Sequence, residues 1–464
     1  MSKAQKVLSS SCPVQISGVF PHLAVVVDAV PYRSETGIGA LMPWADRLWF
    51  VTYVSSRGGR SGTGTGLFSI DQDLTLTKHP ESVVGVYADR MIHKQTDQLI
   101  IGPHIIDHRG NVRTFGALVD YRLTAVMEHL EDPENKVYFM CMEGEFFEAD
   151  VHTLEARFMF DLSKEWGIRP HFKAGYTGQG RVIVANNTYQ DSDFEGKTAN
   201  GRLAEWDGNE WTILETCMFN TVTGRTSISN AIYAVGADNA SAILKVRLDD
   251  QWQTYRLPKA THTQDHSWTT EWPRIREVES ERWLMNCSGM FYELPAMTYG
   301  GRVWGVRPIS THLRIIGDFC SWRGLLVLAG DQTTPIHDHN RFVGQPQANL
   351  WFGKTDDLWS FGKPKGWGGP WRGQLVEAGR PSDPFLMTGF EHKCVHLTHG
   401  ADRPVSFQIQ VDFRGDGSSW ETYETFDVSA NGYAYHVFPT GFSAHWVRIV
   451  SSAACKASAI FHYT

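Results

Sequence analysis

The chain has 464 residues, with 43 Lys and Arg against 51 Asp and Glu and a formal net charge of −8 at pH 7. Because no long run of Lys or Arg appears, we expect no nucleic-acid partner. No stretch approaches the roughly 20 apolar residues of a membrane span, so we expect no membrane insertion. The 17 Trp, the 43 Gly and an aromatic content of 12% indicate a β-rich protein with many tight turns.

The amino-terminal segment and the cysteines bear on the cellular compartment. The first residues, MSKAQKVLSSSCPVQ, lack the apolar core of a signal peptide, which indicates a cytoplasmic protein or a trimmed secreted or periplasmic one. The seven cysteines are scattered without short paired spacings, so we predict no disulfide framework. The compartment and the oligomeric state stay open.

One apolar strand recurs seven times along the chain. Its copies start at Leu48, Leu99, Val137, Val182, Ile232, Trp283 and Leu325, at intervals of 38 to 51 residues. Another strand precedes most copies, as in ALMPW and PRIREVE, and a strand with its own turn follows most of them. About four strands per unit of about 45 residues is the period of a β-propeller blade. We therefore predict an all-β fold with a seven-bladed β-propeller over about residues 15–365.

The rival fold at this period is a helical solenoid. The repeated runs are short, β-branched and aromatic, with turn residues between them, which argues against helices. The character changes after the segment GKPKGWGGP at 362–370, and residues 375–464 contain alternating strands such as SFQIQVDF and HWVRIV. We predict a β-sandwich accessory domain there. It could bind sugar or pack against the propeller, and we favour packing because its aromatic residues fall in strands rather than on an exposed platform.

Polar residues gather at one end of the predicted blades, where the innermost strand starts and the next strand ends. This set comprises His104, His171, Asn187, Tyr189, Arg225, Asp238, Trp272, Arg274, His312, Asp331 and Gln332. Histidines, arginines and a tyrosine that converge on one mouth suit a site for an anionic substrate. We therefore expect this mouth to be locally positive although the protein is net negative.

The residue types narrow the reaction. A glycosidase normally needs two carboxylates about 5 to 10 Å apart, and the candidates Asp238, Asp331 and Glu143 are spread over three blades. Elimination beside a uronic acid instead needs a cation that offsets the carboxylate charge. It also needs a base for the C5 proton and an acid for the departing oxygen at C4, roles that Tyr or His can fill. The gathered residues therefore favour a uronate lyase.

Long motifs support this interpretation. The segments GIGALMPWADRLWFVTYV, ADRMIHKQTDQLIIGPHIID, HLEDPENKVYFMCMEG and THTQDHSWTTEWPRIREVESERW occur in one series. In this series the chain resembles, over nearly its whole length, the seven-bladed propeller family of L-rhamnose-α-1,4-D-glucuronate lyases, first described as glycoside hydrolases. That family is in turn similar to the propeller ulvan lyases. The resemblance implies a polysaccharide lyase that acts on an acidic plant or algal oligo- or polysaccharide and needs no cofactor for its chemistry.

The resemblance also implies roles for single residues. The segment ANNTY followed by GRLAEWDG looks like the one that carries the ulvan-lyase Tyr and Arg, which maps onto Tyr189 and Arg202. The best match to the His on which the rhamnose–glucuronate lyases depend is His104, in LIIGPHIID. We expect Tyr189 to take the C5 proton while His171 or His104 steadies the uronate carboxylate. The residues predicted to bind substrate are Asn187, Arg202, Arg225, Trp272 and Arg274.

Two alternatives and one metal site stay open. The first-blade strand continues as Thr52-Tyr53-Val54-Ser55-Ser56-Arg57, with no histidine, so the second hypothesis is a non-catalytic propeller that binds uronate-containing glycans. The third is a glycoside hydrolase that releases a terminal sugar from glucuronate.

The ulvan lyases carry a structural metal, and here THTQDHSW and PIHDHN suggest structural Zn²⁺. The predicted ligands are His262, His266 and His337, with His339 and Cys320 nearby; the alternative is two polar loops on neighbouring blades.

Overall fold

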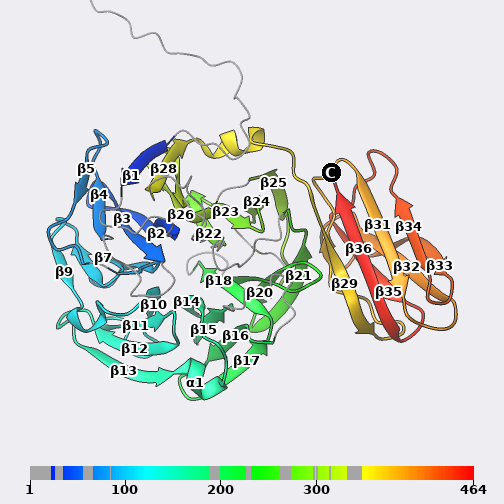
Figure 1. The fold of residues 1–464 in the computed structure, drawn as a ribbon, viewed down its shortest axis with the longest axis horizontal. Coiled ribbons are helices and arrows are strands. Elements are labelled where there is room, and N and C mark those ends of the chain that lie inside the picture. The colour runs from blue at the N-terminus through cyan, green and yellow to red at the C-terminus, as the bar shows by residue number, and fades with distance from the viewer. Residues whose placement is uncertain are drawn as a thin grey trace, which may run out of the picture.

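The structure is a computed structural model that describes residues 22–26, 35–55, 66–83, 85–187, 199–225, 231–260, 273–295, 298, 301–312, 315–331 and 347–464. In this part of the chain, seven sets of four antiparallel strands stand around a common axis, and a β-sandwich lies beside them (Figure 1). The prediction of an all-β fold with a seven-bladed propeller and a carboxyl-terminal sandwich is confirmed.

Six blades use four consecutive strands, with the first strand innermost and the fourth outermost. Blade one contains β2 (Glu35–Trp44), β3 (Arg47–Ser55), β4 (Leu67–Ile70) and β5 (Leu76–Lys78). Blade two contains β6 (Arg90–His93), β7 (Gln98–Ile101), β8 (His104–Asp107) and β9 (Val112–Thr114). Blade three contains β10 (Leu123–Glu128), β11 (Lys136–Cys141), β12 (Glu145–Asp150) and β13 (Ala156–Asp161). Blade four contains β14 (Phe172–Gly178), β15 (Arg181–Asn186), β16 (Arg202–Trp206) and β17 (Trp211–Glu215).

The remaining blades complete the ring. Blade five contains β18 (Met218–Gly224), β19 (Ile232–Ala237), β20 (Ala242–Leu248) and β21 (Gln251–Leu257). Blade six contains β22 (Arg274–Glu279), β23 (Arg282–Cys287), β24 (Met290–Leu294) and β25 (Arg307–Thr311). Blade seven contains β26 (Ile315–Trp322), β27 (Leu325–Asp331), β28 (Gln347–Gly353) and, as its outer strand, β1 (His22–Val26). The first strand of the chain pairs antiparallel with β28, so the last blade is built from both ends of the propeller and the ring is closed by backbone hydrogen bonds.

The apolar cores lie between neighbouring blades. Leu41 and Phe50 of blade one pack in one cluster with Cys320 and Val327 of blade seven. Similar clusters join blades three and four, four and five, and six and seven. Because the second strand of each blade is covered on both faces, it reads as an unbroken apolar run, and all six residues of β19 are buried. This packing explains why the second strand was the clearest repeat in the sequence.

The sandwich has two sheets, ordered β29-β36-β31-β34 and β30-β35-β32-β33. Its strands are β29 (Gly366–Val376), β30 (Phe385–Leu386), β31 (Lys393–His399), β32 (Val405–Asp412), β33 (Glu421–Val428), β34 (Tyr433–Val437), β35 (Trp446–Ser451) and β36 (Cys455–Tyr463). The described helices are η1 (Gly116–Leu118), α1 (Leu162–Trp166) and η2 (Thr355–Ser360). Among the described residues, no helix has the length and apolar character needed to cross a bilayer.

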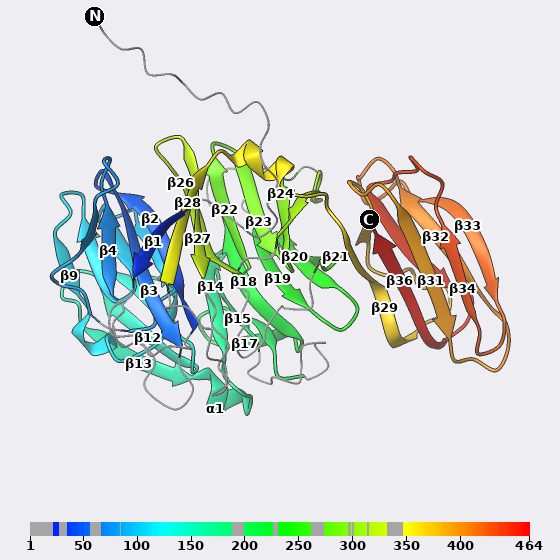
Figure 2. The ribbon, with the colours of Figure 1, turned by 45° about the horizontal axis from the view of Figure 1, so that its top comes forward.

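The sandwich packs against blade five (Figure 2). Strand β21 pairs in parallel with β30, which continues the blade-five sheet into the sandwich. Beside this joint, the buried Arg256 forms ion pairs with Asp238 of its own blade, at 2.8 Å, and with Asp383 of the sandwich, at 2.9 Å. The ammonium group of Lys259 lies 4.8 Å from the ring centre of Trp367. Backbone pairing, charge and an aromatic contact therefore all hold the two domains together.

One premise about the sandwich is wrong. Its aromatic residues were expected to lie away from any exposed platform, yet Tyr433 and Tyr435 of the edge strand β34 are 58% and 62% exposed. Their rings stack with centroids 6.2 Å apart. Tyr433 and Tyr435 face solvent together because successive side chains of a strand alternate between its two faces.

Candidate functional site: an arginine-lined cavity on the propeller axis

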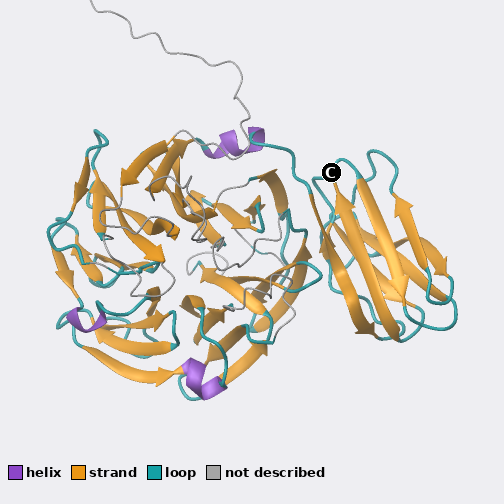
Figure 3. Ribbon diagram, viewed as in Figure 1, coloured by secondary structure: helices purple, strands orange, loops and turns teal. Residues whose placement is uncertain are grey.

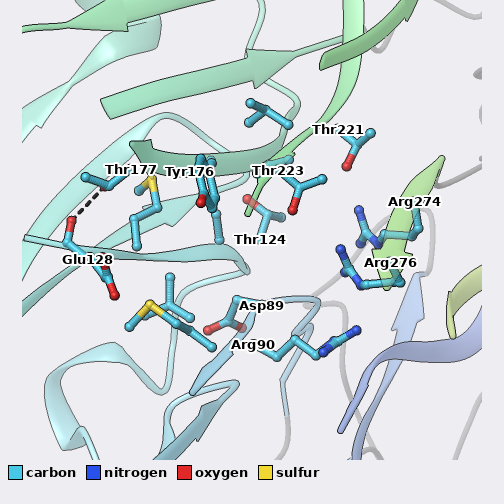
Figure 4. Close-up of a pocket in the computed structure, with 18 of the residues that line it drawn as sticks. Asp89, Arg90, Thr124, Glu128, Tyr176, Thr177, Thr221, Thr223, Arg274 and Arg276 are labelled. Carbon is cyan, nitrogen blue, oxygen red and sulfur yellow. Dashed lines mark hydrogen bonds between the residues drawn. The ribbon is translucent and has the colours of Figure 1, made fainter. Parts of the chain in front are cut away.

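A cavity of about 430 Å³ lies on the propeller axis, enclosed by the inner strands of blades two to six (Figure 4). The hydroxyl groups of Thr124, Thr221 and Thr223 line its middle. The Tyr176 ring lies against β18, where a Cβ atom on Gly224 would come within 2.7 Å of the ring. Glycine at this position therefore admits the ring between two inner strands, and hydroxyl groups and apolar side chains both line the wall.

Two arginines bind one buried carboxylate at the edge of this cavity, and a third arginine lies beside them. Arg90 donates from Nε to Asp318 Oδ2 at 2.6 Å, and Arg276 donates from Nε to Asp318 Oδ1 at 2.9 Å. Arg274 donates from Nε to the carbonyl oxygen of Gly317 at 3.0 Å. Asp318 is fully buried and also accepts the backbone N–H of Leu41 at 3.0 Å. We call Arg90, Arg274, Arg276 and Asp318 the arginine cluster.

The arginine cluster carries more positive than negative charge. Its guanidinium groups lower the pKa of Asp318 to about 2. Burial and the neighbouring cations lower the pKa of Arg276 to about 9 and that of Arg274 to about 10, so both remain charged at pH 7. Taken by themselves, the four residues of the arginine cluster hold three positive charges and one negative charge. Such an arrangement favours an anionic ligand.

Asp89 lies on the same cavity wall, one residue before β6. Its side chain is buried, and neither carboxyl oxygen has a hydrogen-bond partner within the described part of the chain. Burial raises its pKa well above the ordinary value of 3.8. Asp89 lines the same cavity as Arg90, Arg274 and Arg276 (Figure 4).

The far end of the cavity has a different character. Arg225 follows the last residue of β18 and forms an ion pair with Glu277 at 3.1 Å. Glu128 and Lys94 line the same region. Thr177 donates a hydrogen bond to the carbonyl oxygen of Glu128 at 2.7 Å. Among the described residues, the cavity is therefore positive at the arginine cluster and balanced in charge at the opposite end.

The two predicted catalytic histidines lie outside this cavity. His104, at the start of β8, is fully buried and shares a hydrogen bond of 2.9 Å with the hydroxyl of Thr114. Burial lowers its pKa to about 4. His171 is also buried, and burial together with Lys173 and Arg122 holds its pKa well below 6.5. Both side chains are neutral at pH 7, and the expectation that one of them steadies a uronate carboxylate stays a prediction.

The predicted binding residues are only partly brought together. Asn187 lies beside His171: its backbone N–H donates to the His171 carbonyl oxygen at 3.1 Å, and its side chain donates to Asn220 at 2.7 Å. Arg202 starts β16 and binds the carbonyl oxygen atoms of Ala199 and Gly201, away from the cavity. Arg274 and Arg225 both line the cavity, but at opposite ends of the inner strands. The expectation that Arg225 shares the mouth with His171 is therefore wrong.

Several predicted residues lie outside the described residues. These are Tyr189, Trp272 and the proposed metal ligands His262, His266 and His337. Cys320, which was placed near the metal ligands, is buried in β26, and burial raises the pKa of its thiol to about 12. Within the described ranges, no three His, Cys, Asp or Glu side chains are grouped so that they could hold a metal ion.

Four residues of the site were not predicted: Asp89, Arg90, Arg276 and Asp318. A usable signal was present in the sequence. Arg274 and Arg276 are two residues apart in a strand, so they point to the same face, and charges on one face of an innermost strand must point to the axis. Asp89 and Arg90 stand at the start of an innermost strand, where the site was expected, whereas Arg276 and Asp318 lie within their strands.

Neither a protein-family model nor a curated protein matches the sequence. Among solved structures, the WD40 repeats of RRP9 align with a TM-score of 0.42 and 9% identity, over 71% of this chain and 97% of that one. The β-propeller domain of Myceliophteria thermophila Cps50 (Swd1) gives 0.37 and 11%, over 72% and 99%. A chain in the structure of S. cerevisiae Dbp5 bound to Nup159, Gle1, IP6 and ADP gives 0.37 and 10%, over 73% and 96%. At these identities the likenesses say nothing about activity.

Proposed function

We propose that this propeller is a carbohydrate-active enzyme that binds a uronate-containing glycan in its axial cavity and cleaves the bond beside the uronate by β-elimination. The supporting observation is the arginine cluster, in which Arg90 and Arg276 bind the carboxylate of Asp318 and Arg274 lies beside them on the carbonyl oxygen of Gly317. Guanidinium groups bind carboxylates through paired hydrogen bonds. A uronate carboxylate would offset the excess positive charge, and the threonine hydroxyl groups suit the sugar hydroxyls.

The proposed reaction uses this charge directly. A base removes the proton at C5, the electrons of the C–H bond form a double bond between C4 and C5, and the bond from C4 to the glycosidic oxygen breaks. The departing oxygen then takes a proton. Negative charge builds up on the uronate carboxylate during proton removal, and preorganised cations stabilise such charge most strongly in a water-poor site. Tyr189 remains the proposed base, on the strength of the family resemblance.

The test is incubation with rhamnose-capped arabinogalactan and with ulvan. Elimination leaves a conjugated double bond that absorbs in the ultraviolet, so an increase in absorbance together with chain cleavage is expected. Replacing Arg276 by Gln should lower the rate by about 10²–10³-fold, as loss of one charge-stabilising group typically does. The matched control is Arg282→Gln in the same blade, because Arg282 pairs with Asp356 outside the cavity. A wild-type rate in Arg276→Gln would show that the cluster does not serve the reaction.

The base is tested separately. Replacing Tyr189 by Phe removes only the hydroxyl group, so the rate should fall by about 10²–10⁴-fold while substrate binding is retained. If the Tyr189→Phe variant turned over a confirmed substrate at the wild-type rate, the base would be another group.

A second candidate function is non-catalytic binding of an acidic glycan. It is favoured by one observation: no histidine lies among the described residues that line the cavity. The same incubation separates the candidates. A binder retains the glycan without producing absorbance or free sugar, whereas a hydrolase releases sugar without the absorbance.

A further inference from the structure

The carboxyl group of Asp89 is the unexplained feature of the axial cavity. It is 1% exposed, and neither oxygen has a hydrogen-bond partner within the described residues. Its neighbour Arg90 directs its guanidinium to Asp318 and to the carbonyl oxygen of Phe319 instead. A buried carboxylate without partners is strongly unfavourable, and such a group becomes neutral by keeping its proton. A neutral carboxylic acid has an O–H donor that still needs an acceptor.

We infer that Asp89 is a neutral carboxylic acid that donates a hydrogen bond to an oxygen of the anionic ligand held by the arginine cluster, so that the cavity binds the anion only while Asp89 holds its proton. This inference rests on the proposed function in one respect, namely that the ligand is an acidic sugar. The acid and the cations line one cavity (Figure 4). The ligand supplies the acceptor that Asp89 lacks, while the guanidinium groups supply the countercharge.

Other titratable groups near the cavity compete with Asp89 for the proton, and they come from several blades. The described groups are Tyr87, Arg90 and Lys94 of blade two, Glu128 and Cys141 of blade three, Tyr176 of blade four, Arg225 of blade five, Arg274, Arg276 and Glu277 of blade six, and Asp318 of blade seven. Burial raises the pKa of Tyr87, Tyr176 and Cys141, which keeps these groups protonated at neutral pH. The pKa of Asp318, about 2, keeps that group charged.

Two carboxylates remain as competitors. Glu277 is held by its ion pair with Arg225 at the far end of the cavity. Glu128 lines the cavity at the same far end, and its side chain is partly exposed rather than buried. Asp89 is the cavity carboxyl that is both buried and without a hydrogen-bond partner in the described part of the chain. It is therefore the group expected to exchange a proton when an anion binds.

The experiment measures binding of sodium D-glucuronate, and of inorganic sulfate as a second anion, to the full chain by calorimetry. Titrations at pH 5.5, 7 and 8.5 in buffers of different ionisation enthalpy report the protons taken up. Below the pKa of the unliganded acid, wild-type protein should bind the anion without proton uptake and with an affinity independent of pH. Above that pKa it should take up as much as one proton per anion, and its affinity should fall by up to about tenfold per pH unit. The Asp89→Asn variant keeps a neutral donor, so it should bind without proton uptake and with an affinity independent of pH. Asp89→Leu should bind more weakly than Asp89→Asn at every pH.

A matched control and three outcomes decide the matter. Glu128→Gln, at the far end of the same cavity, should keep the proton uptake of the wild type. The inference is overturned if Asp89→Leu binds the anion as tightly as Asp89→Asn, if the Glu128→Gln variant loses a proton uptake that the wild type shows, or if no anion binds at all. Loss of the proposed function looks different: glucuronate or sulfate then binds more weakly to Asp89→Leu than to Asp89→Asn, but neither ulvan nor arabinogalactan is cleaved. Wild-type titrations need no variant, so a folding defect in one variant leaves the test intact.

Discussion

Asp318→Asn is the substitution that tests the arginine cluster most directly. Asparagine has nearly the same volume, but it removes the negative charge that faces Arg90 and Arg276 and that offsets Arg274. Arg90 and Arg276 then lose the carboxylate that both of them bind. Because removal of one partner from a buried ion pair leaves an uncompensated charge, the free energy of unfolding should fall by about 3–5 kcal/mol at pH 7.

The pKa of Asp318 gives a second route to the magnitude. Its value of about 2, against an ordinary 3.8, corresponds to about 2 kcal/mol of stability from the charged form. The folded-state pKa is the lower one, so this contribution is fully present above about pH 4 and is lost as the pH falls towards 2. The difference in stability between wild-type protein and Asp318→Asn should therefore shrink over that same window.

The assay is thermal unfolding followed by near-ultraviolet circular dichroism, at pH 7 and at steps down to pH 2.5. For a domain of this size, a loss of about 3 kcal/mol lowers the midpoint by about 5 °C. The control is Glu391→Gln, which breaks the ion pair with Lys363 at 2.8 Å, in which both side chains are more than half exposed. Exposed pairs contribute less than about 1 kcal/mol. If the two variants lost the same stability, the charge of Asp318 would not hold the cluster.

Three further predictions concern stability. Burial lowers the pKa of His104 to about 4, so the free energy of unfolding of wild-type protein should fall by up to about 3 kcal/mol as the pH falls from 6.5 to 4. The thermal midpoint should fall with it, and this decline should be smaller in His104→Gln. Deletion of residues 1–26 removes β1 and opens the ring, so the midpoint should fall by several degrees, whereas deletion of residues 1–21, which leaves β1 intact, should not lower it. Arg256→Ala removes the guanidinium that joins blade five to Asp383, so limited proteolysis should release the sandwich faster than from wild-type protein; an equal rate would show that backbone pairing suffices.

The sequence alone was sufficient for the architecture because the blade repeat is a local pattern. A second strand covered on both faces must be apolar along its length, whichever blades flank it, and so β15, β19 and β23 could each be recognised from their own residues. The innermost strands were harder. Strand β18 presents Thr221 and Thr223 to the cavity, which interrupts the apolar pattern, and it was not predicted. The closing strand β1 was also missed, because its partner β28 lies at the other end of the propeller sequence.

The candidate site depended on tertiary structure. His104 and His171 stand at strand ends, as many site residues do, but the packing of neighbouring blades buries them, and local sequence does not report that packing. Arg90 and Asp318 are 228 residues apart, and they meet only because the ring closes and brings blade two to blade seven across the axis. Charged residues two positions apart in an innermost strand, such as Arg274 and Arg276, indicate side chains that point to the axis. Only the closed ring decides which charges it meets there, since every blade contributes its innermost strand to the same small space.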